Sequence, residues 1–161
     1  MKGLVIYYSL EGHTKLIAET ISKELKCDLL ELKPEKEIPK KGFSKFLWGG
    51  KSVIFNEKPK LINEMPDLNQ YDTLIIGTPI WAGSYVPAIN TFLSENKLNQ
   101  KKLAFFACHA GGGAKKCFDK FQAVLKDNTI LGTIDFQDSS SESEKIEELK
   151  EWIGKILKIN S

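Results

Sequence analysis

The sequence predicts an α/β fold, a three-layer sandwich in which helices cover both faces of a five-stranded parallel sheet of order 2-1-3-4-5. Strand and helix signals alternate along the whole chain, as they do in proteins built from consecutive strand–helix–strand units. Residues 3–8, 73–77 and 102–108 are near-continuous apolar runs, which is typical of strands that helices cover on both sides. Together these observations favour a doubly wound sheet.

The elements follow one another without an internal repeat or a boundary, so we expect a single domain over residues 1–161. The strands are expected at residues 3–8, 28–32, 73–77, 102–108 and 129–136. The helices are expected at residues 14–25, from about residue 87, at residues 115–126 and after residue 141.

Each helix has its own local evidence. The first carries an apolar stripe at helical spacing, which predicts one buried face. Pro87 suits a first helical turn. Ser141 and Glu144 have the spacing of a capping box, and lysines gather near the end of the last helix, as the helix dipole favours.

Residues 33–68 are longer than a crossover between two parallel strands needs. Within them, residues 42–55 are expected to be a partly helical insert with exposed aromatic side chains. Eight lysines and three glutamates lie between Lys33 and Lys60. Such a run indicates either a solvated face or an approach side for an acidic partner or substrate.

Composition narrows the function class. The net charge of +2 does not favour nucleic-acid binding, and no apolar run is long enough to cross a membrane. The first strand begins close to Met1, which leaves no room for a signal peptide, so we expect a cytoplasmic protein.

Three cysteines without CxxC spacing favour free thiols over a zinc site. All cationic side chains except histidine are lysines, so a phosphate would be held by amides, hydroxyls and Lys15.

Three unusual loops follow strands one, three and four, at residues 9–14, 78–85 and 109–113. In the predicted sheet they meet where the winding reverses, which is where ligands bind. The first loop leads from a strand into a helix start that favours an anion. It lacks the spacing of a nucleotide P-loop or a dinucleotide fingerprint. A simple capped turn would give the same local pattern.

The other two loops suit a flat ligand. Trp81 stands among small residues in the second loop, where an exposed indole can stack on an aromatic ring. The third loop carries three adjacent glycines, which let the main chain approach a ligand edge. A tryptophan packed on a helix and a flexible connection are the alternative interpretations.

With these motifs, the chain resembles the flavodoxin family over essentially its whole length, and the short-chain form in particular. The resemblance implies a flavodoxin-like fold that binds FMN. Ser9, Gly12, His13 and Thr14 would surround its phosphate. The ring face and N5 edge would lie beside Thr78, Pro79, Ile80, Trp81, Ala82 and Gly83, and the pyrimidine side beside Cys108, His109, Gly111, Gly112 and Gly113. His109 is a candidate hydrogen-bond partner for the flavin.

Two departures from the family pattern matter. Glu11, in the same phosphate loop, stands where the family usually has a hydroxyl residue, so we expect its carboxylate to point away from a phosphate. Electron-carrier flavodoxins are strongly acidic, whereas this chain is slightly basic. The usual charge for docking to basic partners is therefore absent.

The resemblance implies an electron-transfer protein that works with redox partner proteins or a small-molecule electron acceptor, as a monomer or a homodimer. One alternative is an FMN-dependent NAD(P)H oxidoreductase acting on quinones or similar small acceptors. Another is an interaction module that kept the fold and lost the cofactor. No catalytic side chain and no metal site are expected, because the flavin supplies the chemistry.

Overall fold

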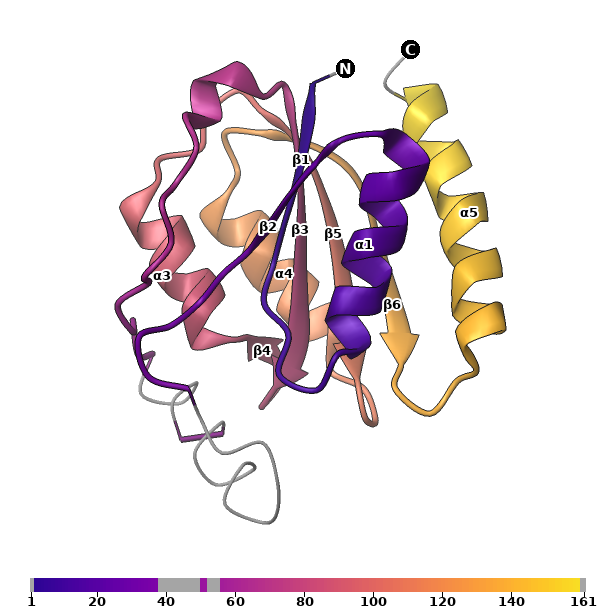
Figure 1. Ribbon diagram of the computed structural model, residues 1–161, viewed down its shortest axis with the longest axis horizontal. Coiled ribbons are helices and arrows are strands. Elements are labelled where there is room, and N and C mark those ends of the chain that lie inside the picture. Colours follow the sequence, from indigo (N-terminus) through magenta and orange to yellow (C-terminus); the bar gives the residue numbers. More distant parts are fainter. Residues whose placement is uncertain (1, 38–49, 52–55, 160–161) are drawn as a thin grey trace.

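The computed structural model describes residues 2–37, 50–51 and 56–159 (Figure 1). The strands are β1 (Gly3–Tyr7), β2 (Asp28–Glu31), β3 (Thr73–Trp81), β4 (Ser84–Tyr85), β5 (Lys102–His109) and β6 (Thr129–Gln137). The helices are α1 (His13–Leu25), α3 (Pro87–Glu95), α4 (Ala114–Val124) and α5 (Glu142–Ile159), with a short 3-10 turn at Leu68–Gln70. The expected insert at residues 42–55 lies outside the described residues apart from residues 50–51.

The five parallel strands have the order β2-β1-β3-β5-β6, which confirms the predicted order 2-1-3-4-5. The centre of the sheet is formed by β1, β3 and β5, whose apolar runs gave the prediction. Tyr7 pairs with Gly77 at the end of β1, and β3 continues along β5 beyond that point. The carboxyl ends of β1, β3 and β5 therefore share one edge of the sheet.

Two helix layers bury the two faces of the sheet (Figure 1). Successive side chains of β1 alternate between them: Leu4 and Ile6 pack on the α3 and α4 side, and Val5 and Tyr7 on the α1 and α5 side. Both sets are apolar and buried, as expected of a central parallel strand. In the part of the chain that the structure describes, no helix has both the length and the apolarity needed to cross a membrane.

The expectation of a loop over residues 78–85 is wrong, because most of this segment is a β-hairpin. Beyond Gly77, β3 pairs through Thr78 and Pro79 with β5, and then Ile80 and Trp81 pair antiparallel with β4. In the described structure β1 no longer flanks this part of β3, and proline is tolerated on such an edge.

The turn of the hairpin consists of Ala82 and Gly83, which have φ values of 49° and 71°. Two-residue hairpin turns of type I′ require positive φ at both positions. Glycine meets this requirement without strain, whereas alanine does so at a cost. The hairpin therefore presents Trp81, next to its turn, in a defined position at the carboxyl edge of the sheet.

Candidate functional site

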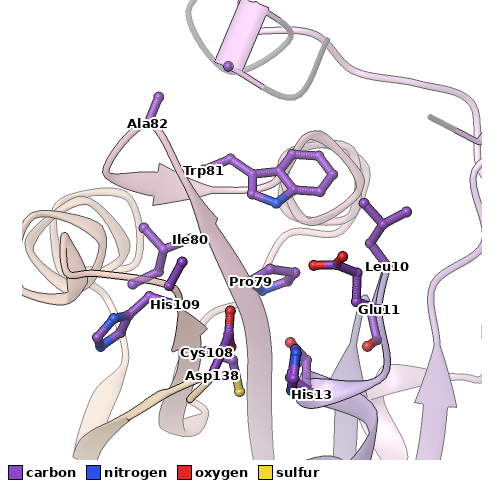
Figure 2. A pocket seen from close by; sticks show the side chains of 14 residues that line it. Leu10, Glu11, His13, Pro79, Ile80, Trp81, Ala82, Cys108, His109 and Asp138 are labelled. Carbon is purple, nitrogen blue, oxygen red and sulfur yellow. The ribbon is translucent and has the colours of Figure 1, made fainter. Parts of the chain in front are cut away.

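A pocket of about 200 Å³ opens at the carboxyl edge of the sheet, between the ends of β1, β3 and β5 (Figure 2). The residues that line it are Ser9, Leu10, Glu11, His13, Thr14, Gly50, Pro79, Ile80, Trp81, Ala82, Cys108, His109, Ala110 and Asp138. All three loops singled out in the sequence reach this pocket, and a fourth segment, after β6, closes it through Asp138.

The first loop presents the start of α1 to the pocket. Gly12 has a φ of 99°, and its amide donates to Ser9 Oγ at 3.1 Å. The first intrahelical bond runs from Leu16 N to Gly12 O at 3.0 Å. The amides of the turn before it, at His13 and Thr14, have no intrahelical acceptor. Unpaired amides and the helix dipole make this a favourable place for an anion.

Glu11 was expected to point its carboxylate away from a phosphate, and this stays a prediction. Glu11 lines the pocket, and Figure 2 shows its side chain extending from the first loop toward Pro79. The chain turns into α1 at Gly12, and this turn leaves the preceding residue on the pocket side. A carboxylate therefore lies in the same loop as the anion-binding amides, which weakens the positive potential they create.

The hairpin supplies the apolar wall of the pocket, through Pro79, Ile80 and Trp81. The indole of Trp81 is half-buried and meets the ring of Tyr8 edge to face, with centroids 5.9 Å apart. Tyr8 is itself fixed, since its hydroxyl donates to Glu37 Oε2 at 2.9 Å. Burial and this carboxylate raise the pKa of Tyr8 well above its usual value, so its hydroxyl stays protonated.

Thr78 and Gly83 lie behind this wall and do not line the pocket. Thr78 is fully buried, and its hydroxyl accepts from Val86 N at 3.2 Å and donates to Pro79 O at 2.7 Å. These bonds hold the two arms of the hairpin together. Gly83 lies against α4, where a Cβ would come within 3.1 Å of Lys116 Cδ.

The third loop brings Cys108, His109 and Ala110 to the pocket. Figure 2 shows the imidazole of His109 turned away from Trp81 and Glu11. Its Nε2 is 2.9 Å from Asp135 Oδ2, and its Nδ1 accepts the amide of Gly112 at 2.8 Å. Both ring nitrogens are thus already used, so His109 has no free polar atom for a ligand, contrary to the expectation that it could bond the flavin.

The floor of the pocket contains a buried thiol beside a carboxylate. Cys108 is 3 % exposed, and burial raises the pKa of its thiol to about 12. It therefore stays protonated at neutral pH and is a poor nucleophile. Among the described residues, Asp138 Oδ1 is a buried oxygen without a hydrogen-bond partner.

Ten of the sixteen site residues expected from the sequence line this one pocket. Those that do not are Gly12, Thr78, Gly83, Gly111, Gly112 and Gly113. Three of these glycines still serve the site indirectly. Gly12 starts α1 and Gly113 starts α4, both at positive φ, and the amide of Gly112 bonds His109.

Sequence reasoning missed four lining residues, which are Leu10, Gly50, Ala110 and Asp138. Asp138 could have been found, because it directly follows the last strand of a parallel sheet and so lies at the same edge as the three loops. Leu10 and Ala110 are apolar members of the loops already chosen. Gly50 belongs to a segment whose path no local pattern predicts.

A sequence model of the family described as flavodoxin matches residues 2–156. A flavodoxin-like domain-containing protein, BilS, from Clostridioides difficile is 27 % identical over 150 residues, which cover 90 % of this chain and 70 % of that protein.

Two solved structures are also similar. A flavoprotein from Lactobacillus acidophilus, crystallised in complex with FMN, is 26 % identical with a TM-score of 0.74 and covers 92 % of this chain and 98 % of its own. A flavoprotein from Bacteroides uniformis is 22 % identical with a TM-score of 0.80, over 95 % and 97 % of the two chains; at this identity the likeness concerns the fold alone.

Proposed function

Because the chain belongs to the flavodoxin family, we propose that it binds FMN in the pocket at the carboxyl edge of the sheet and carries electrons. The observation that carries this proposal is the convergence of three loops on one pocket, with an anion-favouring helix start in the first and a half-buried indole in the second. The FMN complex of the similar L. acidophilus protein supports the choice of ligand.

The pocket offers chemistry that fits FMN. The unpartnered Oδ1 of Asp138 needs a donor, and FMN carries ribityl hydroxyls and a ring N–H that can donate. The third loop also packs closely on the hairpin: a Cβ on Gly113 would meet Gly83 Cα and Ile80 Cγ2 at 3.1 Å. This contact fixes the third loop on the hairpin, and both of these segments line the pocket through other residues, Ala110 and Ala82.

Different parts of the pocket would hold different parts of FMN. The amides of His13 and Thr14, with the hydroxyl of Ser9, would hold the phosphate. Trp81 and Pro79 would pack on the ring and exclude water from it. When bound, FMN supplies the chemistry, because it takes up and releases one or two electrons. The chain itself supplies the position and the surrounding charge.

The proposed redox partners are proteins or a small-molecule electron acceptor. We place the protein in a reducing compartment such as the cytoplasm, because Cys27, Cys108 and Cys117 are all unpaired. Residues 1–161 are proposed to form one domain.

The test is a titration of the purified, ligand-free protein with FMN, followed by quenching of the flavin fluorescence. We expect saturable quenching at one FMN per chain. Trp81→Ala should bind roughly fivefold more weakly, and Trp81→Phe should recover part of the loss, because an aromatic ring contributes about 1 kcal/mol by stacking. A folded protein that leaves FMN fluorescence unchanged would refute the proposal.

A second measurement separates a carrier from an NAD(P)H oxidoreductase. The FMN-loaded protein is mixed with NADH or NADPH and a quinone, and the loss of nicotinamide absorbance is followed. A carrier is expected to show no sustained turnover unless a separate reductase is added. Rapid turnover by the chain alone would instead establish the oxidoreductase alternative.

A further inference from the structure

His109 joins three segments at the carboxyl end of β5. Its Nε2 bonds Asp135 on β6 at 2.9 Å, and its Nδ1 accepts the amide of Gly112 in the glycine loop, residues 110–113, at 2.8 Å. A nitrogen that accepts an N–H carries no proton of its own. The ring is therefore neutral, with its proton on Nε2 and donated to Asp135, and its side chain is only 11 % exposed.

The bond to Gly112 also positions the next residue, Gly113. Gly112 and Gly113 have φ values of 121° and 90°, so this stretch follows a path that glycine alone adopts readily. Gly113 packs so closely on the hairpin that an added Cβ would lie 3.1 Å from Gly83 Cα. The imidazole thus holds the glycine loop against the Ala82–Gly83 turn, and each of these segments lines the pocket through one residue, Ala110 and Ala82.

A second proton would change this arrangement. Protonated Nδ1 is a donor, so it cannot accept the amide of Gly112, whereas the bond from Nε2 to Asp135 becomes an ion pair. Protonation therefore strengthens the anchor on β6 and releases the glycine loop. Histidine is the side chain whose ordinary titration falls between about pH 5 and pH 8.

Charged groups on every neighbouring element bear on this proton. Asp135 on β6 contacts the ring, and Asp138 follows the same strand. Lys145 on α5 donates from Nζ to Asp138 O at 2.9 Å. Across the pocket lie Glu11 and His13 of the first loop.

We propose that His109, held by Asp135, is a positioning residue that fixes the glycine loop for FMN, and that a second proton on His109 releases the loop and weakens FMN binding. The inference rests on the proposed FMN function and adds a proton-linked control of the same site. By linkage, FMN binding would favour the neutral imidazole.

The first test needs no flavin. In the ligand-free protein labelled with ¹⁵N, the amide signal of Gly112 should shift as the pH falls from about 8 to about 5, with the midpoint of the His109 ring. Asp135→Asn keeps an acceptor and removes the charge, so it should move both midpoints to lower pH together. A Gly112 signal that does not follow the ring would refute the loop-fixing role.

The second test compares FMN affinity between variants. His109→Asn places an oxygen near the position of Nδ1, so it can accept from Gly112 but does not titrate. At about pH 8 it should bind FMN within threefold of the wild type, whereas His109→Leu, without an acceptor, should bind about three- to tenfold more weakly than either. Rescue by Asn but not Leu separates the hydrogen bond from mere packing.

The decisive quantity is the ratio of wild-type to His109→Asn dissociation constants across the pH range. A pH effect that does not involve His109 acts on both proteins equally, so it cancels in this ratio. We expect it to rise by about tenfold between pH 8 and pH 5. If both proteins bind FMN and the ratio of their dissociation constants does not change with pH, the inference is overturned and the proposed function stands. Absence of FMN binding at every pH, with Gly112 still following His109, would overturn the function and the FMN control alone.

Discussion

At the scale of single residues, the site is built from side chains whose polar atoms are mostly committed to the protein. Thr78 is used inside the hairpin, and both nitrogens of His109 bond neighbouring segments. Asp138 differs, because its Oδ1 is buried without a partner among the described residues. A buried polar atom without a partner costs stability, so we expect this oxygen to accept a hydrogen bond from the proposed ligand.

Replacing Asp138 separates these two roles. Asp138→Ala removes the unpartnered oxygen, so the free energy of unfolding of the ligand-free protein should stay the same or rise. FMN affinity should fall about ten- to hundredfold, because a hydrogen bond to a charged group contributes about 1.5–3 kcal/mol. Chemical denaturation and FMN titration measure the two effects.

Asp138→Asn is the matched control, since it keeps a carbonyl oxygen as an acceptor and should retain more of the affinity. Loss of stability without loss of affinity in Asp138→Ala would show that the carboxylate serves the fold alone.

At the scale of elements, the helices begin in two different ways. α1 and α4 start at glycines with positive φ, Gly12 and Gly113, without a side-chain cap, and the first residues of α1 line the pocket. α5 begins differently, because it is closed by a capping box. There Ser141 N donates to Glu144 Oε2 at 3.0 Å, and Glu144 N donates to Ser141 Oγ at 3.3 Å. The start of α1 therefore leaves amides beside the pocket, whereas the start of α5 is closed by its own side chains.

The capping box makes part of the stability depend on pH. The bonds from Ser141 hold the pKa of Glu144 below its usual value. A carboxyl whose pKa is lowered by folding stabilises the protein above the unfolded-state pKa, and this contribution is lost as the pH falls through the folded-state pKa. At neutral pH, Glu144→Ala should therefore be less stable than the wild type, and the difference should shrink below about pH 4.

Glu148→Ala is the matched control, because it removes the same side chain from an exposed position one turn later in α5. Denaturant unfolding curves at several pH values give the comparison. Equal stability losses in the two variants at neutral pH would contradict the capping role.

At the scale of the whole molecule, stability depends on two apolar layers packed against one central sheet. β3 is a central strand of this sheet, between β1 and β5. Gly77 on β3 faces the ring of Phe106 on β5. A Cβ at Gly77 would overlap that ring, so the absence of a side chain here is what lets the aromatic ring fill the core. Close-packed interiors have no room for such an addition.

Two alanine substitutions should therefore have opposite effects. Gly77→Ala overpacks the core and should lower the free energy of unfolding by about 1–3 kcal/mol. Gly154 is an exposed residue of α5 with open space around it. Gly154→Ala should raise the free energy of unfolding by roughly 0.5–1 kcal/mol, because alanine favours a helix more than glycine. Urea unfolding measures both, and a Gly77→Ala protein as stable as the wild type would show that the core can rearrange.

The sequence by itself determined the features that depend on neighbouring residues. The apolar runs of β1, β3 and β5 predicted a parallel sheet, and Ser141 with Glu144 predicted the start of α5. The order of parallel strands then brought the three loops to one edge. Each of these follows from periodicity, local capping or connection rules, none of which needs a distant contact.

Only the tertiary structure decided which side chains meet across the sheet. Asp135 reaches His109 because of the register of β6 on β5, in which Gln137 pairs with His109 after a shift between Leu103 and Ala104. A register slip of one residue would move Asp135 to the opposite face of the sheet. The hairpin of β3 and β4 could not be predicted either. In the sequence, Pro79 indicates the end of a strand, whereas in the structure it pairs with β5. Residues far apart in sequence acquire such partners only when the whole sheet has formed, so no local pattern records them.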